Sequence, residues 1–240
     1  MNNALLFHSF DGNVNADPFY DLKLNDFKDI LKSFKNKKNG NQITITFDDG
    51  FKSIIPAVEY SLENKFKTII FISTDYLGKE GFLTDLDLKY LSSKGCIIGS
   101  HTKSHANLTK LKISLLKKEL SDSKLILQKI INKKVDILSF PYGQKNKRSI
   151  KQALLYYDFI AISRPLIFKS KSIIGRISIN KSNVYDHQRI FKISHNKFNI
   201  IFISRLLILK IIKFIIPNKY YLILKSKITG NISKDIFGSN

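Results

Sequence analysis

Residues Ile43–Gly50 read Ile-Thr-Ile-Thr-Phe-Asp-Asp-Gly, an apolar run that ends in two adjacent carboxylates and a glycine. The β-branched residues of Ile43–Phe47 predict a buried strand. Asp48 and Asp49 are hard to explain by structure alone, because neighbouring carboxylates repel each other and prefer water. In a strand-to-loop turn they can point different ways, one toward a metal and one toward a water. A solvated Asp-Asp-Gly turn is also common, so the stretch needs support from the rest of the chain.

Similar apolar runs alternate with helical patterns along most of the chain. Continuous apolar strands separated by helices predict a parallel sheet covered on its outer face, and about seven such units suit a barrel. An open doubly wound sheet is the alternative, which periodicity does not exclude. The predicted strands are Ala4–Phe7, Ile43–Phe47, Thr68–Ile72, Cys96–Gly99, Val135–Phe140, Phe159–Ile162 and Ile173–Ile179. The predicted helices are Asp26–Phe34, Ser53–Glu63, Thr84–Ser93, Ile113–Ile131 and Ser149–Tyr156, the third opening on a variant capping box of Thr84 and Asp87.

The chain is strongly basic. Its 240 residues include 40 Lys and Arg against 19 Asp and Glu, a formal net charge of +21. Such a charge suits nucleic acid, an anionic membrane or an acidic polymer, and it equally fits a genome biased toward Lys, Ile and Asn codons. No basic aromatic platform or nucleic-acid motif accompanies the charge, so we expect no nucleic-acid partner.

Two features bear on the cellular compartment. Cys96 is the single cysteine and lies in the apolar run CIIG, which excludes an intrachain disulfide and favours a structural thiol. The opening stretch MNNALLFHSFDG lacks a charged region followed by a long apolar one, so we expect no signal peptide. Together they predict a cytoplasmic location.

The last part of the chain differs in composition. Residues 198–216 are mostly apolar, and their charges are Arg205, Lys210 and Lys213. Three basic residues offset the apolar contribution to insertion, so spanning a membrane is marginal. A wide apolar face with a basic edge predicts a helix lying peripherally on the inner membrane face, and packing on the barrel is the alternative. We expect a catalytic domain over residues 1–195 and a basic, apolar helical extension over 196–240.

A histidine pair follows the fourth predicted strand, as His101-Thr-Lys-Ser-His105. Histidines at i and i+4 share one face of a helical turn and can chelate a divalent ion. Two imidazoles and the Asp49 carboxylate would form the open three-ligand set of a hydrolytic metal site. Taken alone, the pair also fits a helix N-terminus with polar decoration.

A third motif, Ser139–Gly143 (SFPYG), closes the fifth predicted strand. Proline followed by a Tyr-Gly turn suggests a fixed backbone whose amides could face a reacting oxygen. All three motifs lie at the C-terminal ends of predicted strands, which is where (β/α) barrels gather catalytic residues. This coincidence predicts metal-assisted hydrolysis more firmly than any one motif does.

The motifs resemble those of the NodB-type polysaccharide deacetylases, a carbohydrate esterase family. TFDDG matches the first family motif, HTKSH matches the second, and FPYG resembles the third. The opening LLFHSF is similar to the first strand of the branch that begins with a Tyr-His pair, here Phe7-His8. The resemblance covers roughly residues 4–190. It implies a distorted seven-stranded (β/α) barrel that removes an N-acetyl group from an amino sugar. The expected cytoplasmic location and the C-terminal helix further suggest a glycolipid or lipid-linked amino sugar, or a precursor of surface polysaccharide, as the substrate.

The resemblance also implies residue roles. Asp48 would be the general base, and the backbone N–H of Tyr142 would help stabilise the oxyanion. Thr102 would brace the loop between the two histidines. The ligands of a divalent metal, usually zinc, would be Asp49, His101 and His105.

Two departures from the family pattern affect the catalytic roles. Ser139 stands where the family usually has an arginine that orients the base; Arg176 is our candidate replacement, and Arg164 competes with it. No Leu-x-His motif supplies the usual general acid, although water or Asp48 itself could protonate the leaving amine. The remaining candidates for the acid are His8, His187 and His195.

Two further functions stay open at this point. The same site could cleave sugar esters, which would make the protein an O-deacetylase. The missing arginine and acid also fit a non-catalytic, metal-containing carbohydrate-binding protein. The intact ligand set and base argue against the non-catalytic protein, since a site without catalysis would not need them.

Overall fold

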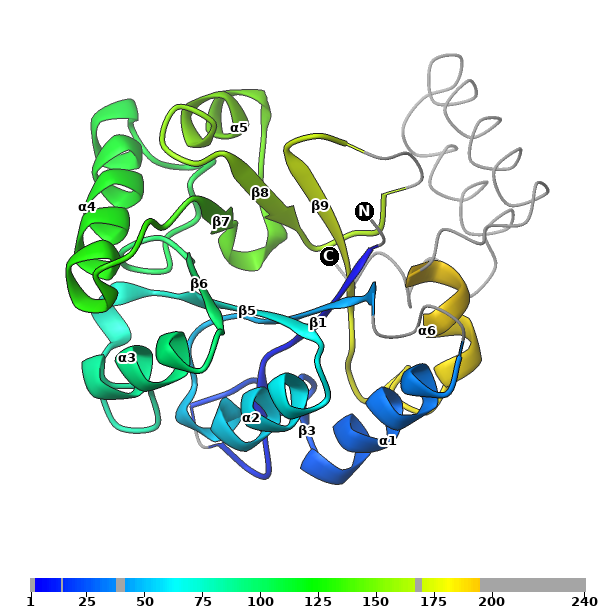
Figure 1. Cartoon of the computed structure of the whole chain (residues 1–240). Helices are drawn as coiled ribbons and strands as arrows, with labels where there is room; N and C mark the ends of the chain where they lie inside the picture. The colour runs from blue at the N-terminus through cyan, green and yellow to red at the C-terminus, as the bar shows by residue number, and fades with distance from the viewer. Residues whose placement is uncertain (1–2, 14, 38–41, 167–169, 195–240) are drawn as a thin grey trace, which may run out of the picture.

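The computed structural model describes residues 3–13, 15–37, 42–166 and 170–194, which form a ring of helices around a barrel (Figure 1). Within these residues seven parallel strands close the barrel in the order β1-β4-β5-β6-β7-β8-β9. The predicted (β/α) barrel is therefore confirmed, and the open sheet is excluded. The strands are β1 (Ala4–Phe7), β4 (Thr44–Phe47), β5 (Lys67–Ile72), β6 (Ile97–Ser100), β7 (Ile137–Ser139), β8 (Phe159–Ile162) and β9 (Ile173–Ser178).

The helices pack on the outside of the barrel, where consecutive helices from α1 to α5 contact each other and α6 packs against α1 (Figure 1). Their bounds are α1 (Leu24–Lys35), α2 (Ile55–Glu63), α3 (Asp85–Ser93), α4 (Ile113–Ile131), α5 (Lys147–Ala153) and α6 (His187–Ser194). Short 3₁₀ turns are η2 (Lys52–Ile54), η3 (Thr74–Tyr76) and η4 (Pro141–Gly143).

Local capping explains where two of these helices begin. The predicted capping box at α3 is present: the Asp87 amide donates to Thr84 Oγ1 at 3.2 Å, and the Thr84 amide donates to Asp87 Oδ2 at 2.8 Å. A second box, which we did not predict, pairs Asn146 with Ser149 before α5. It starts α5 at Lys147, two residues earlier than the predicted start at Ser149.

Alternate residues of each strand face opposite sides of the barrel wall. One set packs with the helices in the large core, and the other forms a small interior cluster around Phe71. Gly99 makes room for this ring, because a Cβ on Gly99 would lie 2.7 Å from the Phe71 side chain. The guanidinium of Arg176 lies 5.2 Å from the centroid of the same ring, and it carries charge into the interior.

Three features differ from the sequence predictions or lie beyond them. A small parallel pair, β2 (Ser9–Phe10) and β3 (Asp21–Leu22), was not predicted, because strands of two residues leave no periodicity. The helix α6 was not predicted either. The predicted membrane segment at residues 198–216, with the whole extension over 196–240, lies outside the described residues. Among the described helices, none is long and apolar enough to cross a membrane.

Candidate metal centre

The turn after β4 separates the two adjacent carboxylates. Asp49 has φ 71° and Gly50 has φ 86°, left-handed values that turn the chain sharply. Asp48 consequently faces Arg176, while Asp49 faces the two histidines that follow β6. The two adjacent carboxylates thus have different closest partners, and His101 Nε2 also lies 3.8 Å from Asp48 Oδ2. These positive or hydrogen-bonding partners offset the repulsion between the carboxylates.

Asp49, His101 and His105 bring one ligand atom each to a common point. Asp49 Oδ1 lies 3.2 Å from His101 Nε2 and 3.1 Å from His105 Nε2. All three candidate ligand atoms lie within 4.8 Å of one another. Two imidazole nitrogens and one carboxylate oxygen are the donor set of an open, three-ligand zinc site, so the arrangement fits a divalent metal.

The tautomer of His101 supports this fit. Its Nδ1 lies 3.0 Å from the carbonyl oxygen of Ser139, and a carbonyl oxygen only accepts hydrogen bonds. Nδ1 therefore carries a proton, which directs Nε2 toward Asp49. Such a bond from the second ring nitrogen is the usual support of a metal-binding histidine.

The histidine pair does not lie on a helical turn, as its spacing predicted. Residues 101–105 form an irregular loop in which Thr102 has φ 69° and His105 has φ 60°. These left-handed residues fold the loop back, so the two imidazoles converge with ring centroids 5.0 Å apart. The i, i+4 prediction was right about convergence and wrong about the conformation that produces it.

The loop is braced by its backbone rather than by the Thr102 hydroxyl, which is buried without a hydrogen-bond partner among the described residues. On one side, three consecutive loop carbonyls accept hydrogen bonds from the segment around η3. The Ser73 hydroxyl donates to His101 O at 3.0 Å, and the backbone amides of the next two residues donate to the next two carbonyls. Thr102 therefore contributes to the brace through its backbone amide and carbonyl, not through its side chain.

Asp48 and Arg176 form a buried ion pair beside the triad. Arg176 is 0% exposed, and its Nη1 and Nη2 donate to Asp48 Oδ1 at 2.6 Å and Asp48 Oδ2 at 2.9 Å. Ser139 bridges the pair, since its Oγ accepts from Arg176 Nη2 at 2.7 Å and donates to Asp48 Oδ2 at 3.0 Å. Ser163 Oγ accepts a further bond from Arg176 Nη2 at 3.2 Å. In the sequence Ser139 stood out only as the position of a missing arginine, and no sequence signal pointed to Ser163.

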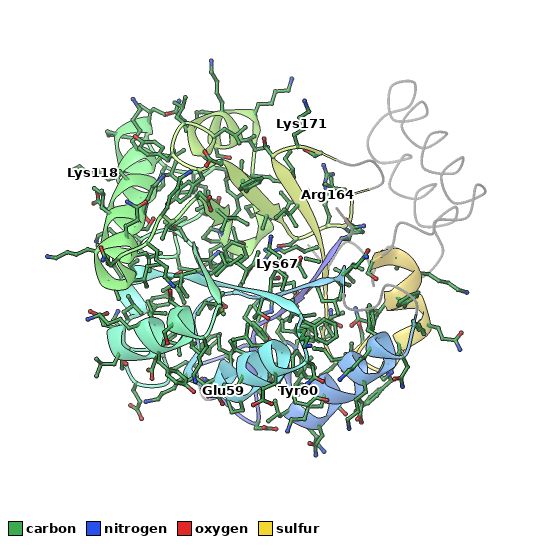
Figure 2. All side chains as sticks on the ribbon, in the orientation of Figure 1. Glu59, Tyr60, Lys67, Lys118, Arg164 and Lys171 are labelled. Atoms are coloured by element: carbon green, nitrogen blue, oxygen red, sulfur yellow. The ribbon has the colours of Figure 1, made fainter. Side chains whose placement is uncertain are left out.

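Arg164, the competitor of Arg176, lies beside β9 with an exposed side chain (Figure 2). Its backbone oxygen accepts the Arg176 amide at 3.1 Å, so it is a neighbour of the pair through its main chain only.

The charges of the centre shift its pKa values in a consistent direction. Burial raises the pKa of Asp48, but Arg176, His101 and His8 together outweigh it and hold the value below its usual range. Burial also acts on Asp49, where hydrogen bonds from both histidines hold the pKa well below its usual range. Burial lowers the pKa of His101, but the two carboxylates outweigh it and raise the value. Metal binding by these atoms would displace such imidazole protons.

The remaining candidate residues fall in different places. His8 has a buried Nδ1 without a hydrogen-bond partner among the described residues, and burial lowers its pKa while Asp49 and Asp48 oppose the shift. Tyr142 is 67% exposed, with its ring 4.6 Å from that of His105. The hydrogen bonds of its turn run from the Gly143 and Gln144 amides, so they do not use the Tyr142 amide.

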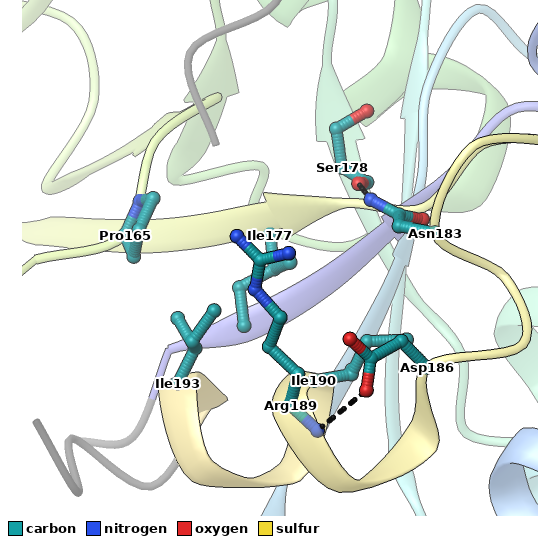
Figure 3. A pocket seen from close by; sticks show the side chains of 8 residues that line it. All are labelled: Pro165, Ile177, Ser178, Asn183, Asp186, Arg189, Ile190 and Ile193. Atoms are coloured by element: carbon teal, nitrogen blue, oxygen red, sulfur yellow. Dashed lines mark hydrogen bonds between the residues drawn. The ribbon is translucent and has the colours of Figure 1, made fainter. Parts of the chain in front are cut away.

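His187 begins α6, which packs against α1 and β9 on the outside of the barrel, and the structure does not bring it into the triad. His195 lies outside the described residues. A small pocket between β9 and α6, lined by Ile177, Ile190 and Arg189 among others, is likewise separate from the metal centre (Figure 3).

The same residues place the chain among known proteins. The family model described as polysaccharide deacetylase matches residues 35–156, about half of the chain, and this span holds both carboxylates, both histidines and Tyr142. The chain belongs to the polysaccharide deacetylase family. In this deacetylase-family chain the match ends before Arg176, so the ion pair joins the matched span to a later strand.

Known relatives of this deacetylase-family chain share sequence and fold. YxkH of Bacillus subtilis, named as a polysaccharide deacetylase, is 30% identical over 126 residues, which is 52% of this chain and 45% of YxkH. The chain thus matches less than half the length of that relative. A polysaccharide deacetylase from Bacillus cereus aligns with a TM-score of 0.67 and 22% identity, over 78% of this chain and 67% of the other. Streptococcus pyogenes deacetylase PplD, solved with acetate, aligns with a TM-score of 0.68 and 17% identity, over 80% of this chain and 97% of PplD. These structures show a shared fold.

Proposed function

We propose that this protein is a metal-dependent hydrolase that removes an N-acetyl group from an amino sugar in a polysaccharide, glycolipid or lipid-linked precursor. The observation that carries the proposal is the convergence of Asp49, His101 and His105 beside a separately held carboxylate, Asp48. Family membership supports the deacetylase chemistry, and the donor set supports zinc as the metal.

The residues divide the chemistry among them. Asp49, His101 and His105 would hold a divalent metal, which would supply Lewis acidity for hydrolysis of the acetamide. Asp48 is the general base and takes a proton from the attacking water. Arg176 and Ser139 keep Asp48 ionised and fix the direction of its oxygens, which suits a base that must be ready at neutral pH.

Two groups serve the later part of the reaction. The Tyr142 amide, which is not used by the hydrogen bonds of its own turn, donates to the developing oxyanion. His8 is our candidate for protonating the leaving amine. Its interactions with the charges of Asp48, Asp49 and His101 support this role. Because burial lowers its pKa, His8 is mostly neutral at neutral pH and has to gain a proton during the reaction before it can donate one.

An O-deacetylase is the second candidate, because the same groups would cleave a sugar ester. The carbohydrate-binding alternative is less well supported, since Arg176 supplies the guanidinium whose absence motivated it. On the basis of the basic, apolar segment 198–216, we further propose a substrate at the inner face of the cytoplasmic membrane.

The test is acetate release from a panel of N-acetylated oligosaccharides and glycolipids with matched O-acetyl esters, with and without a chelator. We expect release from the amides, its loss with the chelator, and its recovery on adding zinc. Asp48→Asn should abolish release while the protein still binds zinc. A fully active Asp48→Asn variant would refute the mechanism, and release from esters alone would identify an O-deacetylase.

A further inference from the structure

Glu119 of α4 reaches the loop that carries both histidines. Its Oε2 accepts the backbone N–H groups of Lys103 and Ser104, each at 2.9 Å. Its Oε1 accepts the hydroxyl of Ser104 at 2.7 Å. One carboxylate thus holds two successive amides and a side chain in the middle of the His101–His105 loop.

A second contact from α4 lies one helical turn further on. Ser123, four residues after Glu119, is on the same face of the helix. Its Oγ lies 2.8 Å from Ser100 Oγ, and Ser100 Oγ accepts the Thr102 amide at 3.1 Å. The amides of Lys103 and Ser104 are therefore held by α4 directly, and the Thr102 amide is held by Ser100, which Ser123 of α4 contacts. The loop carbonyls are held from the segment around η3.

This clamp matters because the loop has an unfavourable backbone conformation. Thr102 and His105 have positive φ although neither is a glycine. This backbone conformation costs energy in residues with a side chain, and it persists only where the surrounding structure imposes it. Ionised carboxylates make stronger hydrogen bonds to amides than neutral acceptors do. Glu119 is the ionisable group among the contacts that hold the loop amides.

We propose that Glu119 is a positioning residue for the metal centre: its carboxylate fixes the loop so that His101 and His105 converge on Asp49. Glu119 is not itself among the clustered metal-ligand candidates, and both of its oxygens are engaged by the loop. This proposal rests on the metal site of the proposed function, but not on the identity of the substrate.

The test is zinc affinity, measured by competition with a chromogenic chelator on the full-length protein. Glu119→Ala should weaken zinc binding about 10- to 100-fold, as is typical when a group supporting metal ligands is removed. Glu119→Gln should weaken it by only about fivefold, since its amide oxygen can still accept both N–H groups without the charge. The control Glu63→Ala removes an exposed glutamate at the end of α2, and Lys118→Ala removes the outward-facing neighbour of Glu119 (Figure 2). Both controls should bind zinc like the wild type.

A second readout separates positioning from a general loss of stability. Visible absorption of the Co²⁺-loaded protein reports ligand geometry, and we expect its band to shift in Glu119→Ala and to stay unchanged in the controls. Zinc affinity within twofold of wild type in Glu119→Ala would overturn the proposal. If that variant does not fold, Glu119→Gln decides, and wild-type affinity in it overturns the proposal. Wild-type protein that binds zinc yet releases no acetate would instead refute the proposed function alone.

Discussion

Replacing Arg176 by Met should expose the energetic coupling of the buried pair. The change removes the two bonds to Asp48 and those to Ser139 and Ser163, and it leaves a carboxylate in a water-poor site. Removing one partner of a buried ion pair costs about 3–5 kcal/mol of the free energy of unfolding. Since domains are stable by roughly 5–15 kcal/mol, the loss would be a large part of the total.

The assay is a double-mutant cycle by urea unfolding of metal-free protein, with Arg176→Met, Asp48→Asn and the combined variant. The combined variant leaves no unpaired charge in the pair, so it should be less destabilised than the two single losses added together. We expect a coupling energy of about 2–3 kcal/mol, near the upper end for residues in contact. If the sum of the two single-variant losses lay within about 0.5 kcal/mol of the loss in the combined variant, the reasoning would be refuted.

The pH dependence gives an independent check on the same pair. Because the pKa of folded Asp48 is lowered, the unfolded chain binds this proton more readily. The contribution of the pair is therefore complete above the unfolded value of about 3.9, and it is lost as the pH falls through the folded pKa. The difference in the free energy of unfolding between wild type and Arg176→Met should therefore shrink as the pH falls below the unfolded pKa of Asp48. A difference that is constant with pH would argue against an ionised Asp48.

Three further outcomes can be measured. Gly99→Ala, which places a Cβ 2.7 Å from the Phe71 ring, should lower the free energy of unfolding by about 1–3 kcal/mol, and an unchanged urea midpoint would contradict this packing. Burial raises the pKa of Cys96 to about 12, so its thiolate population at pH 8 should be roughly a thousandfold below that of a free thiol, and rapid alkylation by iodoacetamide in the native state would contradict it. Replacing Lys210 and Lys213 by Glu should weaken partitioning to anionic vesicles by roughly tenfold or more, as measured by co-sedimentation, and unchanged partitioning would rule out the proposed membrane contact.

Sequence patterns located the centre because its parts are local. The Asp-Asp-Gly turn and the His-x-x-x-His spacing are each contained in five residues, and both follow apolar strand runs that a single sequence reveals. The carboxyl ends of parallel strands meet at one rim, so closing the barrel brings these motifs together. Strand positions were predictable for the same reason, while the two-residue strands β2 and β3 left no periodic signal.

Long-range contacts were only partly within that reasoning: Arg176 and Arg164 were both candidates for the partner of the base, and the structure chose Arg176. Asp48 and Arg176 are 128 residues apart, and nothing local to β9 indicates that its arginine points inward to the base. The convergence of His101 and His105 likewise depends on positive φ values imposed from η3 and α4 rather than on a helical turn.

The sequence by itself determined the alternation of strands and helices, the three metal-ligand candidates and the adjacent carboxylate, because periodicity and short motifs report local structure directly. The tertiary structure decided that the sheet closes into a barrel instead of staying open. Only the tertiary structure decided that Arg176 holds Asp48 and that Glu119 holds the histidine loop. Those choices depend on which side chains become neighbours after the sheet closes, and on which charges must be paired once water is excluded.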